Sequence, residues 1–294
     1  LKNYANKKNI RIIGDIPIYV AEDSADLWRH HGLFKVDENL YPLTVAGCPP
    51  DAYSETGQLW GNPVYDWEAM ERDGYTWWID RIRASFEMYD MVRIDHFRGF
   101  EAYWEVKYGS SDAVNGKWTK GPGYKFFERI KDELGELPII AEDLGFLTDE
   151  VYELIGKTGF PGMKVLQFAF ESGAESEHLP HNYTRNCVVY TGTHDNNTII
   201  GWVKKAGKRE LLFARDYLKL SFEEGFNWGF IRGAFSSTAD TCIIPMQDYL
   251  GLGDEARMNT PSTLGNNWVW RMKEDALTDE LAEKIAKLTR IYGR

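Results

Sequence analysis

The sequence predicts an α/β fold in which parallel strands alternate with helices, in the manner of a (β/α)8 TIM barrel. Three observations support this prediction. Short apolar runs recur along the chain, helical patterns lie between them, and the runs end in acidic or polar residues. Strands that alternate with helices form right-handed βαβ units, and polar residues gather at the carboxyl ends of barrel strands. Since the runs suffice for six strands, we expect the first two barrel strands to be missing from this chain.

The six predicted strands combine β-branched and other apolar residues with a polar residue at or near the end. Their ranges are 11–15, 91–95, 138–143, 163–167, 188–195 and 242–247. Such runs are typical of parallel strands that are buried on both faces. A doubly wound open sheet is the competing architecture, but no glycine-rich phosphate loop follows any of these runs.

Helices are predicted between and after the strands. From residue 75 to 89, apolar side chains recur at i, i+4, i+8 and i+11, which is the spacing of one helix face. Thr148 is expected to cap a helix that has an acidic first turn and buries Val151 and Leu154. Thr278 is expected to cap a helix close to the last residue.

One segment, residues 44–67, is predicted to be neither strand nor helix. It is rich in Gly and Pro, yet it carries Tyr53, Trp60, Tyr65 and Trp67. A loop this long inside a compact domain is usually functional. We therefore expect a loop insertion that covers the active site.

The composition excludes several classes of function. The 294 residues are 43% hydrophobic and 27% charged, which is typical of a globular protein. A net charge of −11 argues against nucleic acid or an anionic membrane as a partner, and suits a neutral polymer. Aromatic residues make up 14% of the chain; some could line a sugar groove, although most are expected to fill the core. No stretch approaches the 18 or so apolar residues of a membrane span.

The cysteines indicate neither a disulfide framework nor a zinc site. Cys48, Cys187 and Cys242 are odd in number and have no C-x-x-C spacing. We expect a reducing, cytoplasmic location, with no metal and no cofactor.

Three acidic residues stand at the ends of three predicted strands. Asp95 is flanked by Arg93 and Arg98, whose charges would hold its carboxylate ionised, as a nucleophile requires. Glu142, beside another acid, is expected to have a raised pKa, as a general acid requires. Retaining glycoside chemistry needs two such groups about 5 to 5.5 Å apart, and a third carboxylate, Asp195, could grip the sugar. Singly, each acid is more often a helix cap or an ion-pair partner, but helix capping does not explain all three together.

Several segments resemble the amylomaltases, which are disproportionating enzymes of bacteria and plants related to the α-amylases. The segments are residues 14–20, 49–63, 93–99, 141–145, 190–196 and 259–268. The resemblance covers nearly the whole chain. The Arg-x-Asp-His pattern is shared with the α-amylase clan, whereas the Ser-Glu-Thr-Gly-Gln-Leu-Trp-Gly-Asn-Pro run is specific to this family. Because members are longer, residues 1–294 are expected to be the C-terminal major part of a catalytic barrel, strands 3 to 8.

The resemblance implies a 4-α-glucanotransferase that moves α-1,4-glucan segments between maltooligosaccharides by a retaining double displacement. Asp95 would be the nucleophile that forms a covalent glucosyl-enzyme, Glu142 the acid/base, and Asp195 the transition-state stabiliser. Maltooligosaccharides and α-1,4-glucans would be donors, and glucose or a maltooligosaccharide the acceptor. We expect no nucleic acid, membrane, metal or cofactor to take part.

The resemblance also implies a set of substrate-binding residues. They are Asp15, Asp51, Tyr53, Gln58, Trp60, Arg93, His96, His194, Asn266 and Asn267. Trp60 and Tyr53 would stack on acceptor glucose units, and Arg93 would position Asp95. His96 and His194 would bond sugar hydroxyls at the cleavage point.

Three alternatives stay open at this level. The first is a glucan hydrolase of the α-amylase clan, which would pass the glucosyl group to water. The second is a metal-dependent barrel hydrolase that uses His96 and His194, although the chain has no H-x-H pair. The third is a non-catalytic glucan-binding module, against which the three acids speak.

Overall fold

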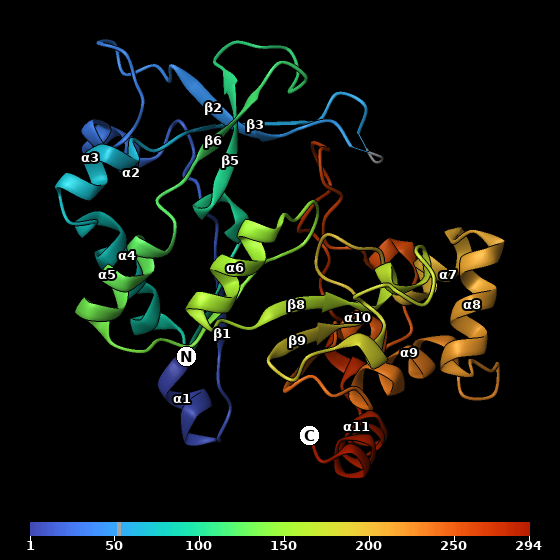
Figure 1. The fold of residues 1–294 in the computed structure, drawn as a ribbon. Coiled ribbons are helices and arrows are strands. Elements are labelled where there is room, and N and C mark those ends of the chain that lie inside the picture. Colours follow the sequence, from blue (N-terminus) through green and yellow to red (C-terminus); the bar gives the residue numbers. More distant parts are fainter. Residues whose placement is uncertain (52–53) are drawn as a thin grey trace. The chain divides into compact units, whose positions relative to one another are not determined.

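The computed structural model describes residues 1–51 and 54–294. They divide into two compact units, Leu1–Gly162 and Met163–Arg294, which are called unit 1 and unit 2 (Figure 1).

A parallel three-stranded sheet in the order β1-β4-β7 forms the centre of unit 1. Its strands are β1 (Ile13–Ile16), β4 (Met91–Ile94) and β7 (Ile139–Ala141). All three have parallel partners, so their carboxyl ends lie along one edge. The register places Asp15 opposite Arg93, and Arg93 opposite Ile140. Polar side chains from different strands therefore meet at this edge.

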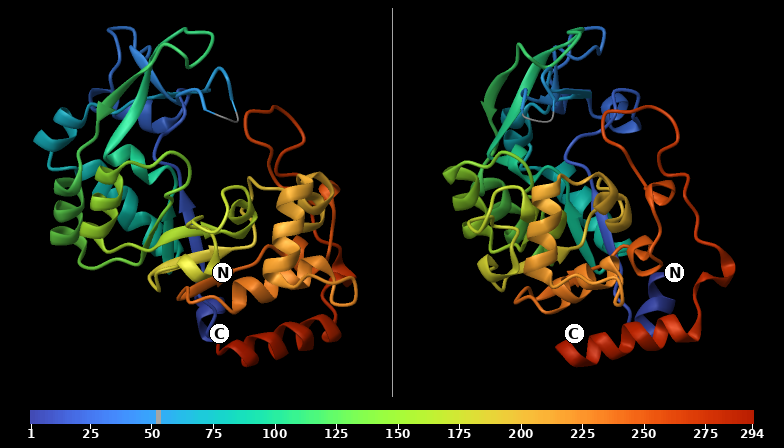
Figure 2. Two further views of the ribbon diagram at one scale, coloured as in Figure 1. Left: turned by 45° about the vertical axis from the view of Figure 1, so that its right-hand side comes forward. Right: turned by 90° about the vertical axis from the view of Figure 1, so that its right-hand side faces the viewer.

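Helices cover this sheet. Those of unit 1 are α1 (Lys2–Lys7), α2 (Ala25–Arg29), α3 (Trp67–Arg72), α4 (Thr76–Met88), α5 (Tyr124–Leu134) and α6 (Asp149–Thr158), with short 3-10 helices η1 (His31–Leu33) and η2 (Phe97–Phe100). Helix α4 packs against β1 and β4, and α4, α5 and α6 lie side by side (Figure 2). The helix predicted from the apolar spacing at 75–89 is thus confirmed. Thr148 is the N-cap of α6, but its hydroxyl bonds the Glu150 carboxylate and lowers the pKa of that group.

The sequence did not predict the second sheet of unit 1. It is antiparallel, in the order β3-β2-β5-β6, and contains β2 (Thr44–Cys48), β3 (Gln58–Pro63), β5 (Ala102–Lys107) and β6 (Lys117–Lys120). The prediction that residues 44–67 are neither strand nor helix is therefore wrong. Glycine and proline concealed the strands: a side chain at Gly47 would come within 2.5 Å of the Gln58 carbonyl oxygen, and Pro63 ends an edge strand, where proline is tolerated.

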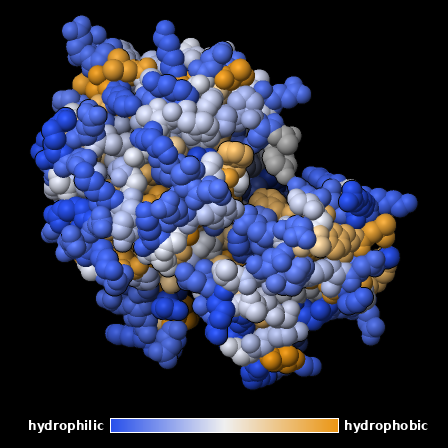
Figure 3. All heavy atoms as spheres, in the orientation of Figure 1, coloured by the Kyte–Doolittle hydropathy of each residue, from blue (hydrophilic) through white to orange (hydrophobic). Residues whose placement is uncertain are grey.

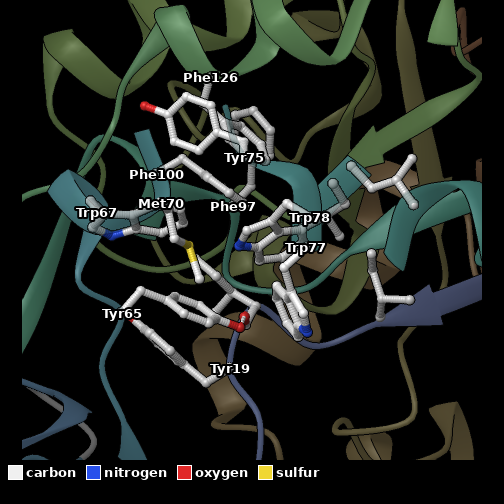
Figure 4. Close-up of a cluster of buried hydrophobic side chains, with 14 of the residues drawn as sticks. Tyr19, Tyr65, Trp67, Met70, Tyr75, Trp77, Trp78, Phe97, Phe100 and Phe126 are labelled. Atoms are coloured by element: carbon white, nitrogen blue, oxygen red, sulfur yellow. Dashed lines mark hydrogen bonds between the residues drawn. The ribbon is translucent and has the colours of Figure 1, made fainter. Parts of the chain in front are cut away.

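Aromatic side chains build much of the core of unit 1 (Figure 4). Trp78 from α4 is fully buried and packs edge-on against Phe100 and Phe126. Tyr65 is also fully buried, and its hydroxyl donates to the Ile18 carbonyl over 2.6 Å, which satisfies its polar end. Many of the aromatic residues thus serve the core, as expected from the composition.

Unit 2 contains another three-stranded sheet, in the order β10-β9-β8, in which β10 and β9 are parallel. Its strands are β8 (Gly162–Val165), β9 (Cys187–Tyr190) and β10 (Thr241–Ile243), and its helices are α7 (Ile199–Lys205), α8 (Lys208–Leu218), α9 (Phe226–Phe235), α10 (Met246–Tyr249) and α11 (Asp279–Tyr292). Short 3-10 helices occur at η3 (Leu166–Phe170), η4 (Pro180–Asn182), η5 (Asp254–Ala256) and η6 (Glu274–Ala276). Helix α9 contacts each of the other four α-helices. Thr278 caps α11 as predicted, because its hydroxyl oxygen accepts from the Leu281 amide over 3.2 Å.

The six strands predicted from the sequence are all present, as β1, β4, β7, β8, β9 and β10. Strands β1, β4 and β7 pair in parallel in unit 1, β9 pairs in parallel with β10 in unit 2, and strands alternate with helices as in an α/β fold. The surface visible in Figure 3 is mostly hydrophilic, with scattered hydrophobic side chains. Within residues 1–51 and 54–294, no helix is long and apolar enough to cross a membrane.

Candidate active site

Asp95 and Glu142 follow two neighbouring parallel strands, β4 and β7. The Asp95 amide donates to the Ile16 carbonyl over 2.9 Å, and the Glu142 amide donates to the Ile94 carbonyl over 3.1 Å. These bonds continue the sheet pairing by one residue beyond each strand. Both acids therefore lie at the same edge of the sheet, on adjacent strands.

Arg93 links Asp95 to Asp15. Arg93 is 8% exposed, and its guanidinium group donates through Nη2 to Asp95 Oδ1 over 2.7 Å and through Nη1 to Asp15 Oδ2 over 2.6 Å. Two separate nitrogens hold two carboxylates, which uses the planar fork of arginine. The Asp95 side chain stays 44% exposed, so a substrate can reach its second oxygen.

Arg98 was predicted to hold the Asp95 carboxylate ionised, but its guanidinium group binds other residues. Its Nη1 donates to the Phe146 carbonyl over 2.7 Å, and its guanidinium lies 3.9 Å from the centroid of the Trp118 ring. Arg98 follows Asp95 by three residues, but η2 turns the chain between them. Adjacency in sequence was a poor guide to which charges meet.

Glu142 is buried and held by two backbone amides. Oε2 accepts from the His96 amide over 2.7 Å, and Oε1 accepts from the Leu144 amide over 2.8 Å. The side chain is 9% exposed, and burial raises the pKa of Glu142 to about 7; the charge of Asp95 adds to the increase. Both amide bonds and Arg93 oppose it. The direction agrees with the expectation from sequence, and near neutral pH such a group can both give and take a proton.

The backbone and the ring of His96 contact different residues. Its φ of 51° is left-handed, and this turn directs its amide at Glu142. Its ring packs edge-on against Trp60, with centroids 4.7 Å apart. Burial lowers the pKa of His96 to about 4, so the ring is neutral at pH 7. The ring therefore adds no positive charge beside Asp95 at pH 7, but a neutral ring can still bond a sugar hydroxyl.

Strand β3 brings Trp60 and Gln58 to this region. Trp60 Nε1 donates to Gln58 Oε1 over 3.1 Å, which orients both side chains. Asp51 Oδ1, in contrast, accepts from the Ser54 amide over 2.8 Å. Tyr53 lies outside the described residues.

Unit 2 holds Asp195 and His194 in the loop after β9. Asp195 Oδ1 accepts from Asn259 Nδ2 over 2.6 Å, and the Asp195 carbonyl accepts from Arg257 Nη2 over 2.6 Å. His194 Nε2 lies 3.5 Å from Asp195 Oδ1. Sequence reasoning missed the roles of Arg257 and Asn259. The available signal was that Asn259 begins one of the recognised segments.

Asn266 and Asn267 differ in their surroundings. Asn267 Oδ1 accepts from the Thr260 amide over 3.0 Å, and its Nδ2 donates to the Thr263 carbonyl over 3.1 Å, so its amide stabilises its own loop. Asn266 is exposed. The neighbouring Trp268 approaches His194 instead, with ring centroids 5.1 Å apart.

The predicted residues thus fall into one group in each unit. Unit 1 brings together Asp15, Gln58, Trp60, Arg93, Asp95, His96 and Glu142, and unit 2 brings together His194 and Asp195. In the part of the chain that the structure describes, no cluster of three or more His, Cys, Asp or Glu side chains could hold a metal ion.

The fold and the site define an α/β protein with two unequal carboxyl groups at the carboxyl ends of adjacent parallel strands. Comparison with known proteins identifies its family: residues 1–278 match the model of the 4-alpha-glucanotransferase family, and the chain belongs to that family.

Relatives and solved structures agree with this placement. The 4-alpha-glucanotransferase of Clostridium butyricum is 60% identical over 296 residues, covering 100% of this chain and 61% of the relative. An amylomaltase from Streptococcus agalactiae in complex with acarbose has a TM-score of 0.97 and 43% identity, covering 100% of this chain and 59% of that one. An amylomaltase from Corynebacterium glutamicum, at 17% identity, shows the fold alone, with a TM-score of 0.81 over 98% of this chain and 47% of that one. The chain spans about 60% of the length of curated relatives that it matches.

Proposed function

We propose that this chain carries the catalytic centre of a 4-α-glucanotransferase. It would transfer α-1,4-glucan segments between maltooligosaccharides by a retaining double displacement. One observation carries the proposal: a carboxylate fixed by Arg93 lies beside a second carboxyl group, Glu142, whose pKa is raised to about 7. Family membership supports the same reaction.

In the first step, Asp95 attacks the anomeric carbon of the donor. The glycosidic C–O bond breaks as the bond from the Asp95 oxygen forms, and Glu142 gives its proton to the departing sugar oxygen. A covalent glucosyl-enzyme and an ionised Glu142 result. Arg93 anchors one oxygen of Asp95, so the other can be aimed at the sugar.

In the second step, Glu142 takes a proton from the acceptor hydroxyl, and the acceptor oxygen displaces Asp95. Two displacements at the same carbon retain the configuration. Asp195, fixed by Asn259 within unit 2, would grip sugar hydroxyls in the transition state. Glucose or a maltooligosaccharide would be the acceptor, and α-1,4-glucans the donors.

Transfer requires a sugar hydroxyl to react in preference to water. Trp60 offers a ring face for an acceptor glucose, and its contact with His96 places it beside the turn that follows Asp95. This favours transfer over the alternative, hydrolysis by an enzyme of the α-amylase clan. Incubation of the full-length protein with maltotriose separates the two reactions, because transfer gives longer and shorter oligosaccharides and hydrolysis gives a net gain of reducing ends.

The roles of the two acids can be tested by trapping. A glucosyl fluoride needs no protonation of its leaving group, so the Glu142→Gln variant of the full-length protein should still be labelled at Asp95, and mass spectrometry should detect the adduct. Asp95→Asn should give no adduct. Glu71→Gln, which changes an exposed acid in the same unit, is the matched control and should keep full turnover. An adduct on Glu142 or Asp195 would overturn the assignment.

A cytoplasmic location belongs to this proposal. The odd number of cysteines favours a reducing compartment, and neutral glucans suit a chain with a net charge of −11. Detection of the protein in a cell fraction other than the cytosol would contradict it.

A further inference from the structure

The loop between β9 and α7, residues 192–198, carries His194 and Asp195. We propose that Asp248 is a positioning residue for this loop and fixes both of its ends. The inference rests on the proposed function, because Asp195 matters for turnover only if it acts on the sugar.

Asp248 uses both of its carboxylate oxygens. Oδ2 accepts from the Thr191 hydroxyl over 2.6 Å, and Oδ1 accepts from the Ile199 amide over 2.8 Å. Thr191 directly follows β9, and Ile199 is the first residue of α7. The two bonds therefore bracket residues 192–198.

The backbone of Asp248 is itself held by hydrogen bonds within unit 2. It lies in α10 and is 1% exposed. Its carbonyl accepts from Asn227 Nδ2 over 2.8 Å, and Asn227 belongs to the largely buried helix α9. Its amide donates to the Pro245 carbonyl over 3.0 Å. The bracket is thus attached to the packed interior of unit 2.

Helix capping does not account for Asp248. Helix α7 has its own cap, because the Thr198 hydroxyl oxygen accepts from the Gly201 amide over 3.0 Å. A buried carboxylate is costly, and burial raises the pKa of Asp248 to about 6. A helix cap would not need the bond to Thr191, which lies at the opposite end of the loop. A role in holding both ends of the loop accounts for this bond.

The loop has further ties within unit 2. Gln167 Nε2 donates to the Asn197 carbonyl over 2.7 Å, and Asn197 Nδ2 donates to Asp254 Oδ1 over 2.7 Å. Both act on the end of the loop close to α7. Asp248 joins that end to β9, and so limits how far Asp195 can move relative to the strand that precedes it.

Asp248→Asn and Thr191→Val test the bracket in the full-length protein. Asparagine keeps the shape but has one acceptor oxygen, and valine removes only the hydroxyl that donates to Oδ2. Each variant should lower kcat about 10- to 100-fold with little change in KM, because a displaced Asp195 affects the transition state more than donor binding. Thr191→Ser keeps a donor and should retain turnover. The double variant should be much less impaired than the product of the two single effects.

Hydrogen exchange supplies a readout that does not depend on the reaction. Amides of residues 192–198 should exchange faster in Asp248→Asn and Thr191→Val, but not in the control Glu224→Gln, which breaks a half-buried ion pair with Arg232 elsewhere in unit 2. Unchanged exchange and unchanged kcat in a folded Thr191→Val variant would overturn the inference, even if Asp248→Asn failed to fold. Faster exchange with full turnover would also overturn it, provided that Asp195→Asn is inactive. If Asp195→Asn itself keeps full turnover, the proposed function fails instead, and the exchange result alone decides whether Asp248 holds the loop.

Discussion

Replacement of Glu142 by Gln should make the protein progressively more stable, relative to the unchanged protein, as the pH rises. In the folded protein burial raises the pKa of Glu142 from the ordinary 4.5 to about 7. Between these two values the folded form holds a proton that the unfolded chain has released. Stability from this group is therefore fully present below about pH 4.5 and is lost as the pH rises through 7. Glutamine does not titrate, so the variant escapes this loss.

The magnitude follows from the two pKa values. A change from 4.5 to about 7 corresponds to about 3 kcal/mol, because each pH unit is worth about 1.4 kcal/mol. Glutamine has one acceptor oxygen for the His96 and Leu144 amides, and this lost bond costs about 1 to 3 kcal/mol at every pH. The lost bond lowers the free energy of unfolding of the variant by the same amount at every pH, so it does not change the dependence on pH. The free energy of unfolding of the variant, minus that of the unchanged protein, should therefore rise by about 3 kcal/mol from pH 4.5 to pH 8.

Urea unfolding, followed by tryptophan fluorescence at several pH values, measures this difference. The full-length proteins should be compared at constant ionic strength, with Glu71→Gln as the exposed control, for which we expect an almost flat difference. The difference in free energy of unfolding between Glu142→Gln and the unchanged protein is the deciding quantity. If it stays constant or falls between pH 4.5 and 8, the argument that Glu142 is buried beside a like charge is refuted.

Three further predictions concern turnover and the core. Turnover of an oligosaccharide donor should fall above about pH 7, because Glu142 then lacks the proton for the leaving group; a kcat/KM profile flat from pH 6 to 9 would contradict this. Trp60→Ala should reduce redistribution of maltotriose more than it reduces glucose release, both measured by chromatography, since a stacking platform orients the acceptor; equal losses would count against it. Trp78→Ala should destabilise the protein by about 3 to 5 kcal/mol in urea unfolding, because the side chain is fully buried among aromatic rings; a loss below about 1 kcal/mol would show that the site collapses.

The parallel strands and the position of the acids were predictable because both depend on short-range pattern. Apolar runs that end in a polar residue predicted β4 and β7, and with them the placement of Asp95 and Glu142 at one edge. Burial is the main cause of the raised pKa of Glu142, and the charge of Asp95 at the adjacent strand end adds to the increase.

The errors arose where chain direction changes over a few residues. Arg98 was assigned to Asp95 from proximity in sequence, but the turn after β4 carries it to Phe146 and Trp118. The strands within residues 44–67 lack clean alternation, because one is interrupted by Gly47 and its partner is an edge strand. Long-range pairings of this kind leave little local signal in a single sequence.

A similar limit applies to the surroundings of Asp195. The family resemblance of residues 259–268 implied Asn266 and Asn267 as sugar ligands. Whether an amide faces a ligand or its own loop depends on the loop conformation. In Asn267 both the oxygen and the nitrogen of the side-chain amide form hydrogen bonds within the loop. Asn259, eight residues before Asn267, is the one that reaches Asp195.

The bond between Arg93 and Asp15 joins residues 78 positions apart, across two strands in direct register. A slip of one residue between β1 and β4 would turn Asp15 to the opposite face of the sheet and leave the guanidinium beside an apolar neighbour. The bond can form only after a long loop has closed, which is a late and slow event in folding. A chain that paired these strands wrongly would thus also lack an ordered Asp95, so molecules with a misfolded sheet would be inactive even if they stayed compact.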